Sequence, residues 1–200
     1  MTVPVYSAGI VSQSFWFIEF KKYLRLIQDG KPEEDIKTLI IKDNIFGAPN
    51  EYRARRMFGY LSSRVKTLCM EEIDLFFICD LASQKIINLI SIAKTDFLLF
   101  EFLNEVYREH VIIGSDYLNL AEARVFMKRK EEQSEIIAAW ADKTKRRMIS
   151  NYFNFLTDAG LLTSVDKNRR ITPPVIDMSL ENYLKSSGEP AILKAITGVY

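Results

Sequence analysis

The chain has 200 residues, 48% of them hydrophobic and 26% charged, so it can bury a core and is not expected to be disordered. Its net charge of +1 conceals two basic zones, residues 21–66 and 142–170, on either side of an acidic middle at 67–120. One histidine and two distant cysteines argue against a zinc site, a redox pair or a nucleophilic enzyme, so we expect no cofactor, no metal and no catalytic residue.

Three helices are predicted before residue 70. Apolar residues recur at helical spacing over 14–28, and Gly30 is placed to end that helix. Pro32 and the acidic residues after it suit the first turn of a second helix, and Asn50 is placed to cap a third over 51–68. The second and third helices resemble a helix-turn-helix pair.

The outward side of the third helix carries arginines and small hydroxyl side chains. Such a row suits a phosphate backbone, because long cations reach phosphates and short side chains allow close approach. The plainer alternative is a solvated helix face. The row comprises Arg53, Arg56, Tyr60 and Ser63, with Arg55, Ser62 and Lys66 beside it.

The acidic middle of the chain shows no motif, and we expect packed helices there. The apolar stretch 86–103 resembles a membrane span but contains Lys94, Asp96 and Glu101, which are costly inside a bilayer. We therefore predict two buried helices separated near Thr95. The start of the chain lacks the basic region of a secretory signal, so we expect a soluble cytoplasmic protein that does not contact a membrane.

Residues 121–172 predict a second binding unit. Helices are expected over 120–131 and 134–140, and a third from Asp142 or Thr144 to a stop at Gly160. The outward face of the third helix holds side chains that suit base edges and phosphates. These are Lys143, Arg147, Ser150 and Asn154, with Arg146 and Asn151 beside them.

After Gly160 the pattern changes to extended chain. Residues 161–165 and 169–172 are β-prone, and the turn between them makes a hairpin that carries Lys167, Arg169 and Arg170. Three helices followed by a basic hairpin are typical of a winged helix, in which the hairpin contacts the DNA backbone.

These patterns predict a mainly α fold, a helical bundle with a helix-turn-helix-like N-terminal part and a C-terminal winged-helix-like unit with a short β-hairpin. We expect three parts: residues 1–70, the acidic central helices 71–115, and the C-terminal unit and tail 116–200. The predicted DNA-binding residues are Arg53, Arg56, Lys66, Lys143, Arg146, Arg147, Ser150, Asn154, Lys167, Arg169 and Arg170.

The N-terminal half also resembles a known family. Tyr6-Ser-Ala-Gly9, Asn44-Ile-Phe-Gly47 and Tyr52-Arg-Ala-Arg-Arg56, running into Leu61-Ser-Ser-Arg-Val-Lys-Thr-Leu68, are similar to BrxA of bacterial BREX phage-exclusion systems. The resemblance covers nearly the whole chain, but its motifs are structural rather than catalytic. It implies an all-helical cytosolic protein, compared in that family with the RNA-binding antitermination factor NusB. It also implies DNA binding in support of a defence complex that includes a methyltransferase and an ATPase.

The first hypothesis is therefore a non-enzymatic accessory protein that binds double-stranded DNA mainly through its phosphates, with other BREX proteins as further partners. Two alternatives stay open. One is an RNA-binding factor, and the other is a protein–protein adaptor whose acidic middle docks on a basic partner.

Overall fold

The computed structural model describes residues 6–165, 168–187 and 189–198, and this part of the chain is mainly helical. Its N-terminal half comprises a 3-10 turn η1 (Gly9–Ser12) and helices α1 (Phe17–Gln28), α2 (Glu33–Ile41), α3 (Glu51–Val65), α4 (Met70–Ile78), α5 (Leu81–Thr95) and α6 (Phe97–Phe102). The other half comprises a π-helical turn η2 (Leu103–Tyr107), helices α7 (Arg108–Ile112), α8 (Leu120–Gln133), α9 (Glu135–Ala138) and α10 (Asp142–Asp158), strands β1 (Leu162–Val165) and β2 (Asn168–Ile171), and helices α11 (Met178–Ser186) and α12 (Pro190–Thr197). The predicted class, mainly α with a short hairpin, is confirmed.

Polar side chains mark where the helices begin. The Asn50 side chain accepts a hydrogen bond of 2.8 Å from the backbone N of Arg53, and Asp80 caps α5 in the same way. These caps satisfy amide groups that have no partner within the helix. Gly160 ends α10 with a φ of 86°, a left-handed conformation that glycine adopts without strain. The sequence therefore fixes these boundaries locally.

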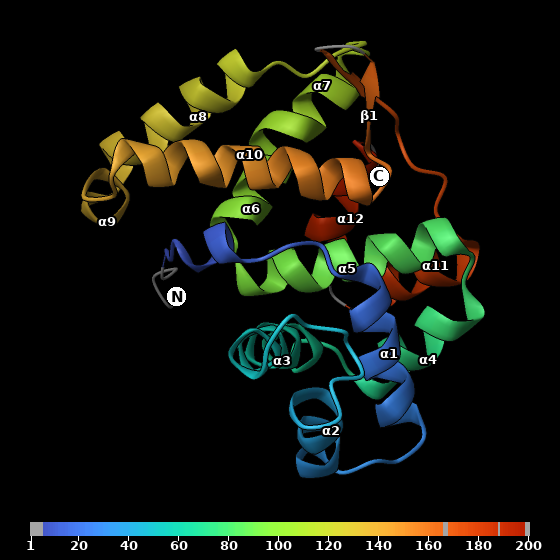
Figure 1. The fold of residues 1–200 in the computed structure, drawn as a ribbon. Helices are drawn as coiled ribbons and strands as arrows, with labels where there is room; N and C mark the ends of the chain where they lie inside the picture. The colour runs from blue at the N-terminus through green and yellow to red at the C-terminus, as the bar shows by residue number, and fades with distance from the viewer. Residues whose placement is uncertain (1–5, 166–167, 188, 199–200) are drawn as a thin grey trace.

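Helix α5 lies at the centre of the molecule (Figure 1). It contacts α1, α3 and α4 on one side and α10 on the other. Its residues 86–93 are all buried, and α6 begins at Phe97, directly after the break at Asp96. The prediction of two buried helices separated near Thr95 is confirmed.

Two short helices, α11 and α12, follow the hairpin in the part of the chain that was predicted only as a tail. Helix α12 packs against η2 and α7, with Ile192, Leu193 and Ile196 buried. Helix α11 buries Leu180 and Leu184. These helices are short, and their apolar positions become informative only with the neighbours they pack against.

The hairpin is attached to the end of α10 and to the segment before α8. In β1 and β2, Leu162 pairs with Ile171 in an antiparallel register. The backbone N of Leu118 donates to the carbonyl of Arg169 at 2.9 Å, and that of Ile171 donates to the carbonyl of Asp116 at 2.9 Å. Residues 116–118 therefore act as a third short strand beside β2, which fixes the hairpin relative to α8 and α10.

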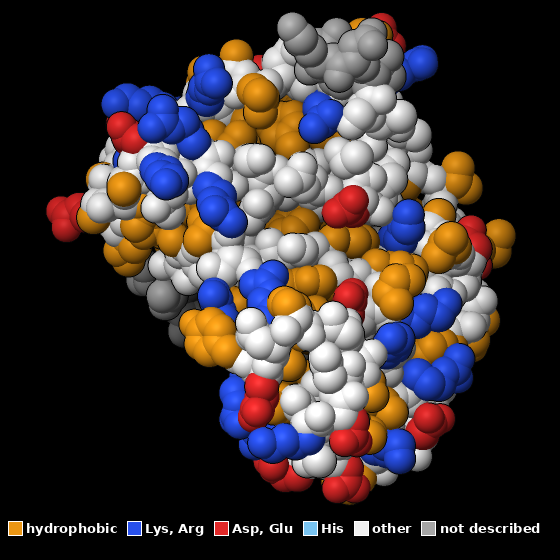
Figure 2. Space-filling view, viewed as in Figure 1, with side chains coloured by type: hydrophobic (Ala, Val, Ile, Leu, Met, Phe, Trp, Pro, Cys, Tyr) orange, Lys and Arg blue, Asp and Glu red, His pale blue; other side chains and the backbone are white. Residues whose placement is uncertain are grey.

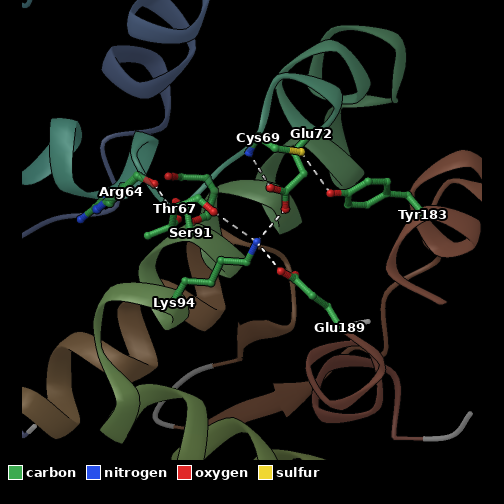
Figure 3. Close-up of polar contacts among 9 residues, drawn as sticks. Arg64, Thr67, Cys69, Glu72, Ser91, Lys94, Tyr183 and Glu189 are labelled. Carbon is green, nitrogen blue, oxygen red and sulfur yellow. Dashed lines mark hydrogen bonds and ion pairs between the residues drawn. The ribbon is translucent and has the colours of Figure 1, made fainter. Parts of the chain in front are cut away.

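The acidic middle is neutralised in part by lysines of the chain itself. Lys94 binds Glu72 at 2.7 Å and Glu189 at 2.8 Å, which ties α5 to α4 and to the start of α12 (Figure 3). The same view shows Cys69, whose backbone N also donates to Glu72. On the other side of the core, the amino group of Lys130 lies 2.6 Å from carboxylate oxygens of both Glu101 and Glu105. These are internal contacts that hold helices together.

Asp96 is a buried carboxylate at the junction of α5 and α6. It accepts hydrogen bonds from the backbone N of Leu99 at 2.8 Å and from the Tyr152 hydroxyl at 3.2 Å. Burial raises the pKa of Asp96 from 3.8 to about 6. A carboxyl group with a raised pKa stabilises the fold fully only below its ordinary pKa, and this contribution is lost as the pH rises through about 6.

We therefore expect Asp96→Asn to be more stable than the wild type at neutral pH, by up to about 3 kcal/mol. Asparagine keeps the cap and the hydrogen bond from Tyr152 but carries no charge to desolvate. Urea unfolding of both proteins between about pH 4 and pH 8 measures the difference, which should shrink towards zero at the acid end. A difference that stays constant with pH would contradict the titration of Asp96.

Candidate nucleic-acid interface

Helix α10 presents its polar face to solvent. Its apolar residues, among them Ile149, Tyr152, Phe153 and Leu156, are buried in the core as predicted. This packing exposes the opposite face. Five of the predicted site residues lie on that face and are exposed: Lys143, Arg146, Arg147, Ser150 and Asn154.

The N-terminal segment runs along the same face of α10 and covers part of it. The Nε of Arg147 donates to the carbonyl of Val11 at 3.0 Å, and the Nδ2 of Asn151 donates to the carbonyl of Ile10 at 2.7 Å. Asn151, placed beside the outward row by its spacing, is therefore held by the backbone of η1. Arg147 uses Nε for this contact, and its side chain remains exposed.

A basic groove lies between α8 and α10. It has a volume of about 430 Å³, and its lining includes the cations Arg124, Lys128 and Arg146 and the carboxylates Glu131 and Asp142. Lys145, at the bottom of the groove, is buried and binds Glu131 at 3.2 Å, which holds the two helices together. The cations of α8 were not predicted from the sequence. Figure 2 shows Lys and Arg side chains gathered around α8 and the adjoining end of α10.

The other end of α10 faces the hairpin across a polar cavity of about 320 Å³. Asn154 and Arg169 both line it, together with Ser14 of the N-terminal segment. The Nη1 of Arg169 donates to the Ser164 hydroxyl at 2.5 Å, and Arg170 is exposed on the same strand. The structure thus brings Arg169 of the hairpin next to Asn154 on the exposed face of α10. Lys167 lies outside the described residues.

Of the predicted cations of α3, Arg53 and Arg56 contact aromatic side chains, whereas Lys66 contacts a carboxylate. The guanidinium of Arg53 lies 5.3 Å from the ring centre of Trp16, and Arg56 donates to the Tyr60 hydroxyl at 3.1 Å. Lys66 instead forms an ion pair of 2.8 Å with Glu33, which reduces its availability for a phosphate. Ser62 is buried and donates to the same carboxylate at 3.1 Å, so its predicted place on the outward side of α3 is wrong.

The N-terminal segment joins the two basic zones. Arg147 of α10 binds the carbonyl of Val11, and the ring of Trp16, in the same segment, stacks on Tyr60 of α3 with the ring centres 6.1 Å apart. One short segment of the chain therefore contacts both α10 and α3. Both groups of cations are visible on one face in Figure 2, above and below this segment.

The buried side chain of Arg64, on α3, holds the N-terminal segment in place through hydrogen bonds. Its Nη1 donates to the carbonyl of Phe15 at 2.9 Å, and its Nη2 donates to the carbonyl of Ser14 at 2.8 Å and to the Oε1 of Gln13 at 2.9 Å. Burial lowers the pKa of Arg64 to about 9, so the group is still a cation at neutral pH. The sequence analysis did not single out this residue, because nothing in the spacing of α3 separates a buried arginine from its exposed neighbours.

The described residues include no group of three or more His, Cys, Asp or Glu side chains arranged to hold a metal ion. The single histidine, His110, pairs with Glu122 at 3.1 Å. In the same part of the chain, no helix has the length and hydrophobicity needed to cross a bilayer.

Comparisons with known proteins agree with this description. The sequence model of the BrxA family matches residues 4–188. The chain belongs to the BrxA family of bacterial BREX systems. A relative from Bacillus cereus (strain H3081.97), named "BREX protein BrxA", is 32% identical over 194 residues, which are 97% of each chain.

The fold also occurs in a solved structure. A crystal structure of an uncharacterized protein from Magnetospirillum magneticum matches with a TM-score of 0.81, covering 98% of this chain and 100% of that one. The two sequences are 18% identical, so this likeness shows the fold alone.

Proposed function

We propose that this protein is a non-enzymatic accessory protein of a BREX phage-defence system that binds double-stranded DNA mainly through its phosphates. Membership of the BrxA family supports the place in a BREX system and suggests other BREX proteins as partners. DNA as the ligand implies that the protein acts in the cytoplasm.

One observation carries the proposal. Lys143 and Arg146 of α10, Arg124 and Lys128 of α8 and Arg170 of the hairpin form no ion pair or side-chain hydrogen bond within the described part of the chain. Internal ion pairs use other lysines, such as Lys94 and Lys130. Exposed cations without internal partners are what a polyanion requires, since each one that meets a phosphate releases a counterion.

The arrangement of these elements supports a winged-helix unit. Helices α9 and α10 are joined by residues 139–141, a connection as short as in helix-turn-helix motifs. In that motif the N-terminal residues of the second helix enter the major groove, and Lys143, Arg146 and Arg147 occupy those positions in α10. The hairpin follows α10 directly, where a wing would contact the backbone. The connection between α2 and α3, residues 42–50, is longer than the turn of a helix-turn-helix motif. For α3 we therefore propose contacts with phosphates but not with bases.

A mobility-shift assay with duplex DNA at increasing salt tests the proposal. If the five unpartnered cations, Lys143, Arg146, Arg124, Lys128 and Arg170, contact phosphates, the logarithm of the binding constant should fall with the logarithm of salt concentration with a slope of about −4.5. Duplexes of different sequence should bind with similar affinity, because phosphate contacts carry little sequence information.

Competition with structured RNA distinguishes the alternatives. If RNA displaces the duplex at lower concentration than DNA of the same length does, the protein is an RNA-binding factor. If neither nucleic acid is shifted and the other BREX proteins co-purify with the chain, it is an adaptor. Either result would overturn the proposed DNA binding.

A further inference from the structure

A cluster of aromatic rings and arginines on α3 is separate from the recognition face of α10. Trp16 and Tyr60 are stacked with their ring centres 6.1 Å apart, and Arg53 lies over Trp16. Arg56 lies between Tyr60 and Tyr52, 5.8 Å and 5.9 Å from the two ring centres. We call these five residues the aromatic platform. Its outermost ring, Tyr52, is 69% exposed.

Trp16 is held in an unusual backbone conformation. Its φ of 48° and ψ of 46° lie in the left-handed region, which bulky residues seldom adopt. The contacts of Arg64 with residues 13–15 hold the chain directly before it, and the carbonyl of Trp16 accepts the first hydrogen bond of α1 from Phe20 at 2.8 Å. Such strain persists only where the surrounding structure enforces it, and it is concentrated at functional sites. Here it places the indole ring beside Tyr60, with the guanidinium groups of Arg53 and Arg64 lying 5.3 Å and 5.5 Å from the ring centre.

From this geometry we infer that the aromatic platform binds unpaired bases of single-stranded DNA. A base stacks on any aromatic face without regard to sequence, and arginines beside the ring contact the adjoining phosphates. The exposed ring of Tyr52 would stack on the base, and Arg53 and Arg56 would contact the phosphates. The rings of Trp16 and Tyr60 hold the two arginines in place. Bases within a duplex are stacked on one another and cannot reach such a face, so the platform suits a single strand.

The inference goes beyond the proposed duplex binding and does not require it. The two sites lie on the same face of the molecule, on opposite sides of the N-terminal segment (Figures 1 and 2). A duplex on α10 that continues as a single strand towards α3 would occupy both. The preferred ligand is then DNA at a junction between paired and unpaired strands.

Fluorescence anisotropy with two labelled DNAs tests the inference. One is a blunt duplex, and the other is the same duplex with a thymidine overhang of about ten nucleotides, long enough for one stacking site. We expect the wild type to bind the overhang DNA at least about fivefold more tightly, the gain typical of one stacked base. Tyr52→Ser should bind both DNAs with the affinity that the wild type has for the blunt duplex. Tyr52→Trp, which restores an aromatic face, should keep the preference.

The control is Ile78→Ser, which removes an apolar side chain of similar exposure, 72%, from α4 on the other side of α1 (Figure 1). It should leave both affinities unchanged. Equal wild-type affinity for the two DNAs would overturn the inference, as would an unaltered preference in Tyr52→Ser. Binding of the overhang DNA with no binding of the blunt duplex would uphold the platform while refuting the proposed duplex function.

Discussion

Replacing Lys143 and Arg146 together with glutamate should weaken binding to duplex DNA by at least about tenfold at about 0.1 M salt. Both side chains are exposed on the N-terminal half of α10, where a recognition helix meets the groove. The salt dependence should flatten as well, by about 2 in the slope, because two fewer counterions are released on binding. Affinity measured across a salt series gives both quantities.

These positions are preferable to Arg147 for this experiment. Arg147 also holds the carbonyl of Val11, so its replacement would loosen the N-terminal segment in addition to removing charge. A matched control reverses Lys31 and Lys37, which lie around the start of α2 at the opposite end of the molecule from α8. This control changes the net charge equally. If both double variants lost affinity to the same extent, net charge rather than a surface on α10 would explain the binding.

The helical fold could be predicted because its signals are local. Apolar periodicity identified α1, α3 and α10, and Gly160 followed by β-prone residues identified the hairpin. Two short C-terminal helices, α11 and α12, were not predicted. Helix α12 packs against η2 and α7, and α11 packs against α12, and such packing between distant segments leaves no periodic signal in a short segment.

The candidate site could be predicted only in part. Spacing along one helix shows which side chains of α10 share a face, and their exposure agrees with it. Spacing does not show that the N-terminal segment lies on that face, where the carbonyl of Ile10 accepts a hydrogen bond from Asn151. Nor does it show that Arg124 and Lys128 of α8 line the same groove as Arg146. These are contacts between distant segments. The division of the chain near residues 70 and 115 and the roles of the individual site residues stay predictions.

Arg64 is the clearest case of a residue whose role depends on distant segments. It is fully buried, and its three hydrogen bonds go to residues 13–15 rather than to a carboxylate. A buried cation costs desolvation energy, which charge-assisted hydrogen bonds offset. Asn88 donates to the carbonyl of Phe15 as well, at 2.9 Å, so α3 and α5 together hold the segment. By holding residues 13–15, Arg64 fixes the position of Trp16 and keeps the N-terminal segment against α10.

Arg64→Met should therefore lower the free energy of unfolding by about 3 kcal/mol. Methionine fills part of the space but leaves the carbonyl of Ser14 and the side chain of Gln13 without their buried donor. Urea unfolding measures the loss, and amide exchange should rise over residues 9–16 more than over α5. Arg64→Lys is the matched variant: it keeps the charge but lacks the planar fork, so it should recover only part of the stability. An unchanged unfolding midpoint together with unchanged exchange at residues 9–16 would show that Arg64 does not anchor the segment.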